Sequence, residues 1–164
     1  MPSESKTGTV PEGSLSDFTR CELITLELRE RDAAGIIGEL TRILRRHDCV
    51  PDVLPFYQAA LNQELLSNSA NGFGIALAHA RLTGVRRLQF ALGRTAQPVV
   101  WGTKGSWPVR LVFLLAVPAT DAASYLHLLS SLARLGRNRE ILEELLAASN
   151  DAGMLAALGK IELQ

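Results

Sequence analysis

The hydrophobic pattern of the chain begins with a strand and two helices. Residues 21–28 alternate between apolar and polar side chains, which predicts a half-buried strand with its apolar residues on one face. These apolar residues are Ile24, Leu26 and Leu28. After Asp32, a good N-cap residue, apolar side chains recur at helical spacing up to Leu44. A second helical pattern spans residues 51–66, where Pro55 has to lie in the first turn because a proline further in would break the helix.

The stretch from residue 72 to residue 81 combines a turn, an apolar run and two polar side chains. Gly72 and Gly74 open it, and the predicted buried strand ends with His79 and Arg81. A histidine at a strand end, with flexible backbone before it, is well placed to meet an anion. The ordinary alternative is a structural histidine that only satisfies a backbone carbonyl. The local pattern leaves both interpretations open.

The second half of the chain reads as strands followed by helices. Residues 88–93 and 99–101 predict two short strands, and residues 109–117 are nearly all apolar, which is typical of an interior strand. Helical patterns follow over residues 121–135, 139–148 and 152–161. In the first of these helices the expected inward residues are Ala122, Leu126, Leu129, Leu132 and Ala133, and the expected outward residues are Ser124, His127, Ser131 and Arg134. The element order predicts an α/β domain with a mixed sheet flanked by helices.

Length and charge narrow the class of protein. A chain of 164 residues fits one domain. Seventeen Lys and Arg balance seventeen Asp and Glu, so no net field favours nucleic acid or an anionic membrane. The longest apolar run, residues 111–117, is far shorter than the roughly 18 residues of a membrane helix, and we expect no direct membrane insertion.

The N-terminus and the cysteines add two expectations. Residues 1–16 are polar and rich in Ser, Thr, Gly and Pro, which predicts a disordered tail ahead of a domain over residues 17–164. Cys21 and Cys49 form no CxxC or CxxH spacing, and a chain this long and this apolar does not need a disulfide scaffold, so the sequence predicts reduced thiols and a cytoplasmic protein.

Few residues are candidates for chemistry. The three histidines are far apart and no metal-binding motif exists, so we expect no metal and no cofactor. Residues 102–106 lack the pattern of a phosphate loop and predict a plain turn. His79 remains, because an imidazole with a pKa of about 6.5 is a competent nucleophile at neutral pH. Phosphoryl transfer to it would need donors around the incoming oxygens, which residues 67–72 and Arg81 can supply.

Two segments resemble a known family. Glu64-Leu65-Leu66 with the Ser/Asn/Gly loop after it, and Gly74-Ile75-Ala76-Leu77-Ala78-His79-Ala80-Arg81, are similar to the phosphorylation-site motif of mannitol/fructose-type enzyme IIA domains. These domains belong to the bacterial phosphoenolpyruvate-dependent sugar phosphotransferase system and include the nitrogen-regulatory IIA proteins. The likeness extends over roughly residues 16–164. It implies the mixed sheet of that family, with His79 accepting phosphate from an HPr-like phosphocarrier protein.

The chain departs from the family motif around the histidine. The family's arginine sixteen positions earlier is Gln63, its proline just before the histidine is Ala78, and its second histidine falls on Tyr125. In the loop, a threonine and a glycine are replaced by Ser69 and Ala70. The resemblance then implies a phosphate pocket made of Ser69, Gln63, Tyr125 and Arg81 around His79. Gln63 and Tyr125 can donate hydrogen bonds but offer no charge, and charge-assisted bonds are about twice as strong.

Two hypotheses follow from the sequence. In the first, the protein is a phosphocarrier whose partners are an HPr-like donor and a regulated target or permease component. The absence of a membrane segment favours the nitrogen-regulatory type. In the second, it is a pseudo-carrier that binds proteins without being phosphorylated. Arg81, Arg86 and Arg87 are candidate cations for the pocket, and Arg45 with Arg46 and His47 forms either a solvated helix end or a binding patch.

Overall fold

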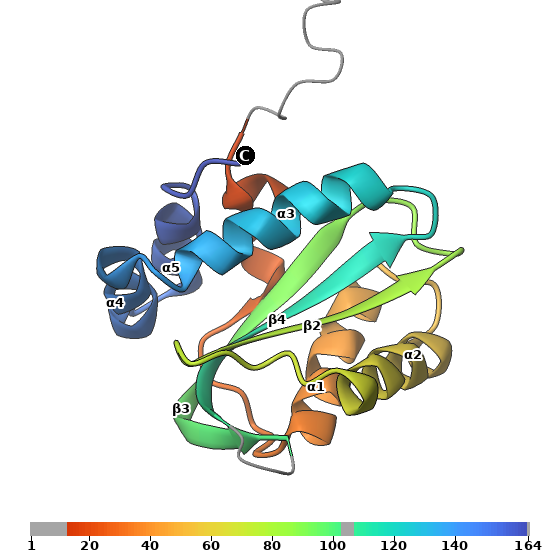
Figure 1. Cartoon of the computed structure of the whole chain (residues 1–164), viewed down its shortest axis with the longest axis horizontal. Coiled ribbons are helices and arrows are strands. Elements are labelled where there is room, and N and C mark those ends of the chain that lie inside the picture. Colours follow the sequence, from red (N-terminus) through yellow and green to blue (C-terminus); the bar gives the residue numbers. More distant parts are fainter. Residues whose placement is uncertain (1–12, 103–106, 164) are drawn as a thin grey trace, which may run out of the picture.

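A four-stranded mixed sheet runs through the molecule, with helices on both of its faces (Figure 1). The computed structural model describes residues 13–102 and 107–163. Its strands are β1 (Ile24–Thr25), β2 (Ile75–Leu82), β3 (Gln89–Trp101) and β4 (Trp107–Pro118), in the sheet order β1-β3-β4-β2. The β3–β4 pair is antiparallel, whereas β1–β3 and β2–β4 are parallel. The predicted α/β fold with a mixed sheet is therefore confirmed.

The helices divide between the two faces of the sheet. Helices α1 (Ala33–Arg46) and α2 (Val53–Leu66) cover one face, and α3 (Ala122–Leu135), α4 (Arg139–Ala147) and α5 (Asp151–Leu158) cover the other (Figure 1). Alternate residues of a strand point to opposite faces. In β4, Val112 and Leu114 accordingly pack with α1 and α2, and Phe113 and Leu115 pack with the C-terminal helices. The prediction of an interior strand at residues 109–117 is confirmed.

Several helix boundaries follow from local capping. The Asp32 carboxylate accepts a hydrogen bond from the Gly35 N–H at 2.7 Å, and Asn150 does the same for Gly153 at 2.7 Å. Pro55 lies in the first turn of α2, as predicted. These interactions reach only three residues along the chain, which explains why the sequence pattern predicts them correctly.

The predicted strand over residues 21–28 is wrong in length. Cys21–Leu23 forms a 3-10 helix, and only Ile24–Thr25 pairs with β3. Ile24 packs in the core under α3–α5, whereas Leu28 packs in the core under α1 and α2. The two residues therefore belong to opposite sides of the sheet, because the chain bends after Thr25 rather than continuing as a strand.

Two other predictions need correction in their details. The two short strands at residues 88–93 and 99–101 are one strand, β3, with a register shift between Arg94 and Val99. In α3 the buried face is rotated from the predicted one. Its buried residues are Leu128, Ser131, Leu132 and Leu135, and Ala122, Leu126 and Ala133 are exposed. The buried Ser131 hydroxyl is satisfied within the helix, because it donates to the His127 carbonyl at 3.0 Å.

The predicted disordered tail, residues 1–16, extends too far into the domain. Leu15 begins a 3-10 helix (Leu15–Phe18), is fully buried, and donates its N–H to the Ile161 carbonyl at 3.0 Å. Residues 1–12 of the predicted tail, and residues 103–106 of the predicted turn, lie outside the described residues. Within the part of the chain that the structure describes, no helix is long and apolar enough to cross a membrane.

Candidate functional site

His79 lies in the middle of β2, an edge strand of the sheet. It is paired with Leu115 of β4, and the pairing continues to Leu82, three residues further on. The predicted strand end is confirmed for Arg81, which lies one residue before the end of β2, but His79 lies further inside the strand than predicted, since β4 keeps pairing with β2 up to Pro118. Ala78 and Ala80 pack toward α1 and α2, so alternation directs the half-buried His79 side chain to the face that α3 covers.

Two groups hold the imidazole of His79. The Tyr125 hydroxyl, on α3, lies 3.3 Å from Nε2, and the two rings are tilted with their centroids 5.3 Å apart. Burial lowers the pKa of His79, and a hydrogen bond with the Leu77 backbone and the charge of Glu64 act in the opposite direction. The hydrogen bond with Leu77 raises the pKa, so it stabilises the protonated ring. In such a bond the ring nitrogen donates, and the Leu77 carbonyl therefore accepts. Since Nε2 faces Tyr125, we assign the donor to Nδ1, which leaves Nε2 as the unprotonated nitrogen of the neutral ring.

A cavity of 310 Å³ opens beside this imidazole. Its lining residues are Ala59, Gln63, His79, Ala80, Arg81, Val117 and Tyr125. The structure thus brings four of the five residues that the sequence singled out to one cavity. Burial raises the pKa of Tyr125 and the charge of Arg81 lowers it, so the phenol stays protonated near neutral pH and can donate a hydrogen bond.

Arg81 is the single guanidinium among the described residues that line this cavity. Its Nε and Nη2 both donate to the Ala119 carbonyl, at 3.1 and 2.8 Å. A guanidinium has five N–H donors, so others remain for an incoming anion. Arg86 and Arg87, the other candidate cations, line a different cavity.

Ser69 does not line the cavity of His79, and its polar groups are directed to Glu64. Its N–H and its hydroxyl both donate to the Glu64 carboxylate, each at 2.7 Å. The indole Nε1 of the fully buried Trp101 donates to the same carboxylate at 2.9 Å. Glu64 thus ties the loop after α2 to the end of β3. Sequence reasoning missed this role, although Glu64 stands in the motif that resembles the family.

The rest of this loop is shaped by its own side chains. The Asn71 side chain accepts from the Phe73 and Ile75 N–H groups, at 2.9 and 3.3 Å. Gly74 has φ of +82°, a conformation that L side chains rarely adopt, and its carbonyl accepts from Arg110 and Leu111. These contacts fix where β2 begins, and therefore the register that pairs His79 with Leu115 of β4.

The depressed pKa of His79 predicts a pH-dependent stability. The unfolded chain takes up a proton near the ordinary value of 6.5, whereas the folded chain does so only at lower pH. The free energy of unfolding should therefore fall as the pH decreases below 6.5 toward the folded-state pKa. In urea denaturation at about pH 7.5 and about pH 5.5, the wild type should lose more stability than His79→Gln. Equal losses in the two proteins would show that His79 does not contribute.

Within residues 13–102 and 107–163 the structure contains no group of three or more His, Cys, Asp or Glu side chains that could hold a metal ion. The site is instead a neutral imidazole beside two uncharged donors and one guanidinium. Such an arrangement suits nucleophilic attack on an electrophile that carries anionic oxygens.

Comparisons with known proteins agree with the motif in the sequence. The family model described as "Phosphoenolpyruvate-dependent sugar phosphotransferase system, EIIA 2" matches residues 17–160. The fructose-specific EIIA component of Haloferax volcanii is 28% identical over 147 residues, which cover 90% of this chain and 96% of the relative. The fructose-specific EIIABC component of Bacillus subtilis is 31% identical over 134 residues, 80% of this chain, and the match spans only 21% of that longer protein.

Among solved structures, the nitrogen regulatory protein IIA-Ntr from Neisseria meningitidis superposes with a TM-score of 0.73 at 26% identity. The superposition covers 88% of this chain and 98% of that one. The mixed sheet with helices on both faces is thus an arrangement that this chain shares with a protein of similar sequence.

Proposed function

The chain belongs to the phosphoenolpyruvate-dependent sugar phosphotransferase system EIIA 2 family, and from this premise we propose that His79 is its phosphoryl acceptor. The protein is a phosphocarrier or regulatory component of such a system. The observation that supports His79 is its neutral imidazole, with Nε2 beside the Tyr125 hydroxyl in a cavity that Gln63 and Arg81 also line. The donor in this proposal is an HPr-like phosphocarrier protein, and both proteins act in the cytoplasm.

The proposed step is an in-line transfer between two imidazoles. The Nε2 lone pair of His79 forms a bond to phosphorus while the nitrogen–phosphorus bond of the donor phosphohistidine breaks, and the donor imidazole keeps that electron pair. Nδ1 retains its proton and donates to the Leu77 carbonyl, which stabilises the positive charge that develops on the ring. In this proposal Tyr125, Gln63 and Arg81, which line the same cavity, donate to the phosphoryl oxygens.

The downstream partner is a further part of the proposal. The relatives include fructose-specific components and a nitrogen regulatory protein, so a permease component and a regulated target protein are both candidates.

A phosphorylation assay tests the proposal. The purified chain is incubated with phosphoenolpyruvate, enzyme I and HPr, and a standard IIA domain serves as the positive control. We expect an acid-labile, base-stable phosphate on the wild type and on His127→Gln, and none on His79→Gln. Label on His79→Gln would refute the assignment of the acceptor.

A second function deserves the same test, since one observation favours it. The single guanidinium among the described lining residues, Arg81, is engaged by the Ala119 carbonyl. A cavity with so little free positive charge also suits a protein that binds partners and is not phosphorylated. An unlabelled, folded wild type beside a labelled standard IIA domain would overturn the first proposal and leave the pseudo-carrier function.

A further inference from the structure

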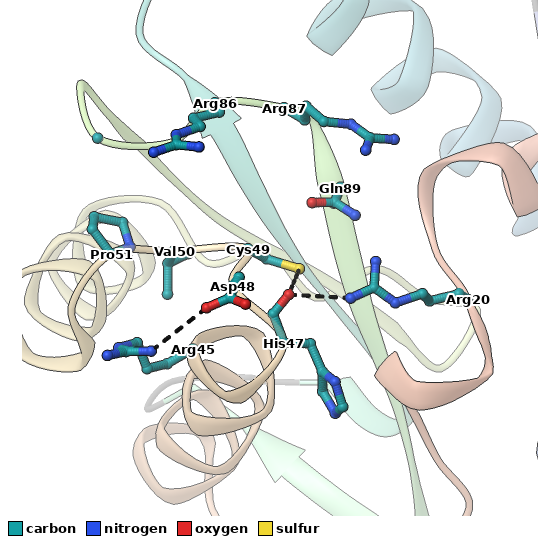
Figure 2. Close-up of a pocket in the computed structure, with 11 residues that line it drawn as sticks. Arg20, Arg45, His47, Asp48, Cys49, Val50, Pro51, Arg86, Arg87 and Gln89 are labelled. Atoms are coloured by element: carbon teal, nitrogen blue, oxygen red, sulfur yellow. Dashed lines mark hydrogen bonds and ion pairs between the residues drawn. The ribbon is translucent and has the colours of Figure 1, made fainter.

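A second and larger cavity, of 550 Å³, shares no lining residue with the cavity of His79 (Figure 2). Three separate segments meet around it: Arg20, the connection between α1 and α2, and the connection from β2 to the start of β3. Four arginines line it (Arg20, Arg45, Arg86 and Arg87), against one carboxylate, Asp48. The excess of positive charge is local, because the whole chain has a formal net charge of zero.

Two of these arginines have ordinary partners. Arg45 is in the last turn of α1 and forms an ion pair with Asp48 at 3.9 Å, so it complements the helix dipole. Arg20 donates to the His47 carbonyl at 3.1 Å and lies 3.7 Å from a carboxylate oxygen of Glu22. Both contacts leave some of its N–H donors unused.

Arg86 and Arg87 have no such partners. Neither side chain forms a hydrogen bond or an ion pair with another residue of the described chain. Figure 2 shows the two side chains pointing away from each other, with the Gln89 amide below Arg87. Because neither of these two adjacent loop arginines forms an ion pair with a carboxylate, their positive charge in the cavity is not compensated.

The loop that carries them is held firmly at both ends. Val85 and Leu88, on either side of the arginine pair, are buried in the two different cores of the molecule. Gly84 lies so close to Pro51 that a Cβ added there would come within 2.7 Å of the proline ring. The β2–β3 connection is therefore packed against the α1–α2 connection, and the cavity between them is formed by segments that are held in place by this packing.

The arginine charges also affect the pKa of Cys49, another lining residue, which is buried. Burial raises the pKa of its thiol, and the charges of Arg20 and Arg87 lower it. The charges of two arginines from distant segments therefore act on the same region of the cavity, although burial and the charge of Asp48 keep the pKa of the thiol above its ordinary value.

The size of the cavity indicates the kind of anion. A cavity of 550 Å³ has room for more than a single oxyanion, since a water molecule occupies about 30 Å³ in the liquid. Guanidinium groups bind phosphate oxygens through paired N–H donors, and here they lie at two sides of the cavity. We propose that this cavity binds a small organic molecule with two phosphate groups, which Arg86 holds on one side and Arg87 with Arg20 on the other.

Calorimetric titration with a graded set of probes tests this site. Glucose, glucose 6-phosphate and glucose 1,6-bisphosphate share one skeleton and differ in the number of phosphates. In buffer of about 0.15 M ionic strength, where exposed charges are screened beyond about 8 Å, we expect the bisphosphate to bind most tightly and glucose not to bind. Binding of the monophosphate as tight as that of the bisphosphate would overturn the two-phosphate assignment.

Matched variants locate the binding. Arg86→Gln with Arg87→Gln should weaken the bisphosphate at least about tenfold, because two charge-assisted contacts become neutral ones. Arg137→Gln with Arg139→Gln removes the same charge from an exposed surface outside the cavity and should leave the affinity unchanged. His79→Gln should also bind normally, which separates this proposal from the phosphocarrier function. No binding to the wild type, or equal weakening in both double variants, would overturn it.

Discussion

Glu64→Ala is expected to lower the free energy of unfolding by about 3 kcal/mol. The Glu64 carboxylate accepts from the Ser69 N–H, the Ser69 hydroxyl and the Trp101 indole. Hydrogen bonds to charged groups contribute about 1.5 to 3 kcal/mol each, and an unsatisfied buried donor costs about 1 to 3 kcal/mol. Water can replace Glu64 at the half-buried Ser69 but not at Trp101, which is fully buried. Thermal denaturation should show a Tm about 6 to 12 °C below that of the wild type.

A double-mutant cycle with Trp101→Phe identifies the cause of this loss. Phenylalanine has no N–H, so the double variant should lose at least about 1 kcal/mol less than the sum of the single variants. Glu143→Ala, at an exposed carboxylate in α4, should stay within about 0.5 kcal/mol of the wild type. Equal effects of Glu64→Ala and Glu143→Ala would contradict the assigned role of the network.

Helix caps and the interior strand could be predicted because their causes are local. The bond from Gly35 to Asp32 spans three residues, and the apolar run of β4 needs no knowledge of its neighbours. The strand at residues 21–28 was predicted wrongly for the opposite reason. Whether Leu28 shares a face with Ile24 depends on where β3 and α1 lie, which the alternation of side chains does not contain.

The candidate site was predictable in part. The motif around His79 indicated four residues that line one cavity, His79 itself and three others. The contact of Ser69 with Glu64, by contrast, depends on a carboxylate that also meets Trp101, 37 residues away. The positions of Arg86 and Arg87 depend similarly on how the β2–β3 connection packs on Pro51. Long-range packing of this kind is what the sequence pattern leaves open.

Gln63→Arg should increase the rate of phosphoryl transfer to His79 about tenfold. Gln63 lines the cavity from the last turn of α2, with its side chain exposed. An arginine there would place a second guanidinium beside the phosphoryl oxygens, and charge-assisted hydrogen bonds are about twice as strong as neutral ones. An added stabilisation of about 1.4 kcal/mol in the transition state corresponds to this factor of ten. A cation near the C-terminus of a helix also suits its dipole, so the fold should tolerate the change.

Gln58→Arg provides the matched control for this gain. It adds the same charge to an exposed position of the same helix, but Gln58 does not line the cavity of His79. Single-turnover transfer from phosphorylated HPr should be faster for Gln63→Arg and unchanged for Gln58→Arg. An NMR titration provides a second readout, since a neighbouring cation should lower the pKa of His79 further in Gln63→Arg alone. A lowered pKa without faster transfer would mean that the charge reaches the imidazole but does not stabilise the transferring phosphoryl group, and it would contradict the predicted gain.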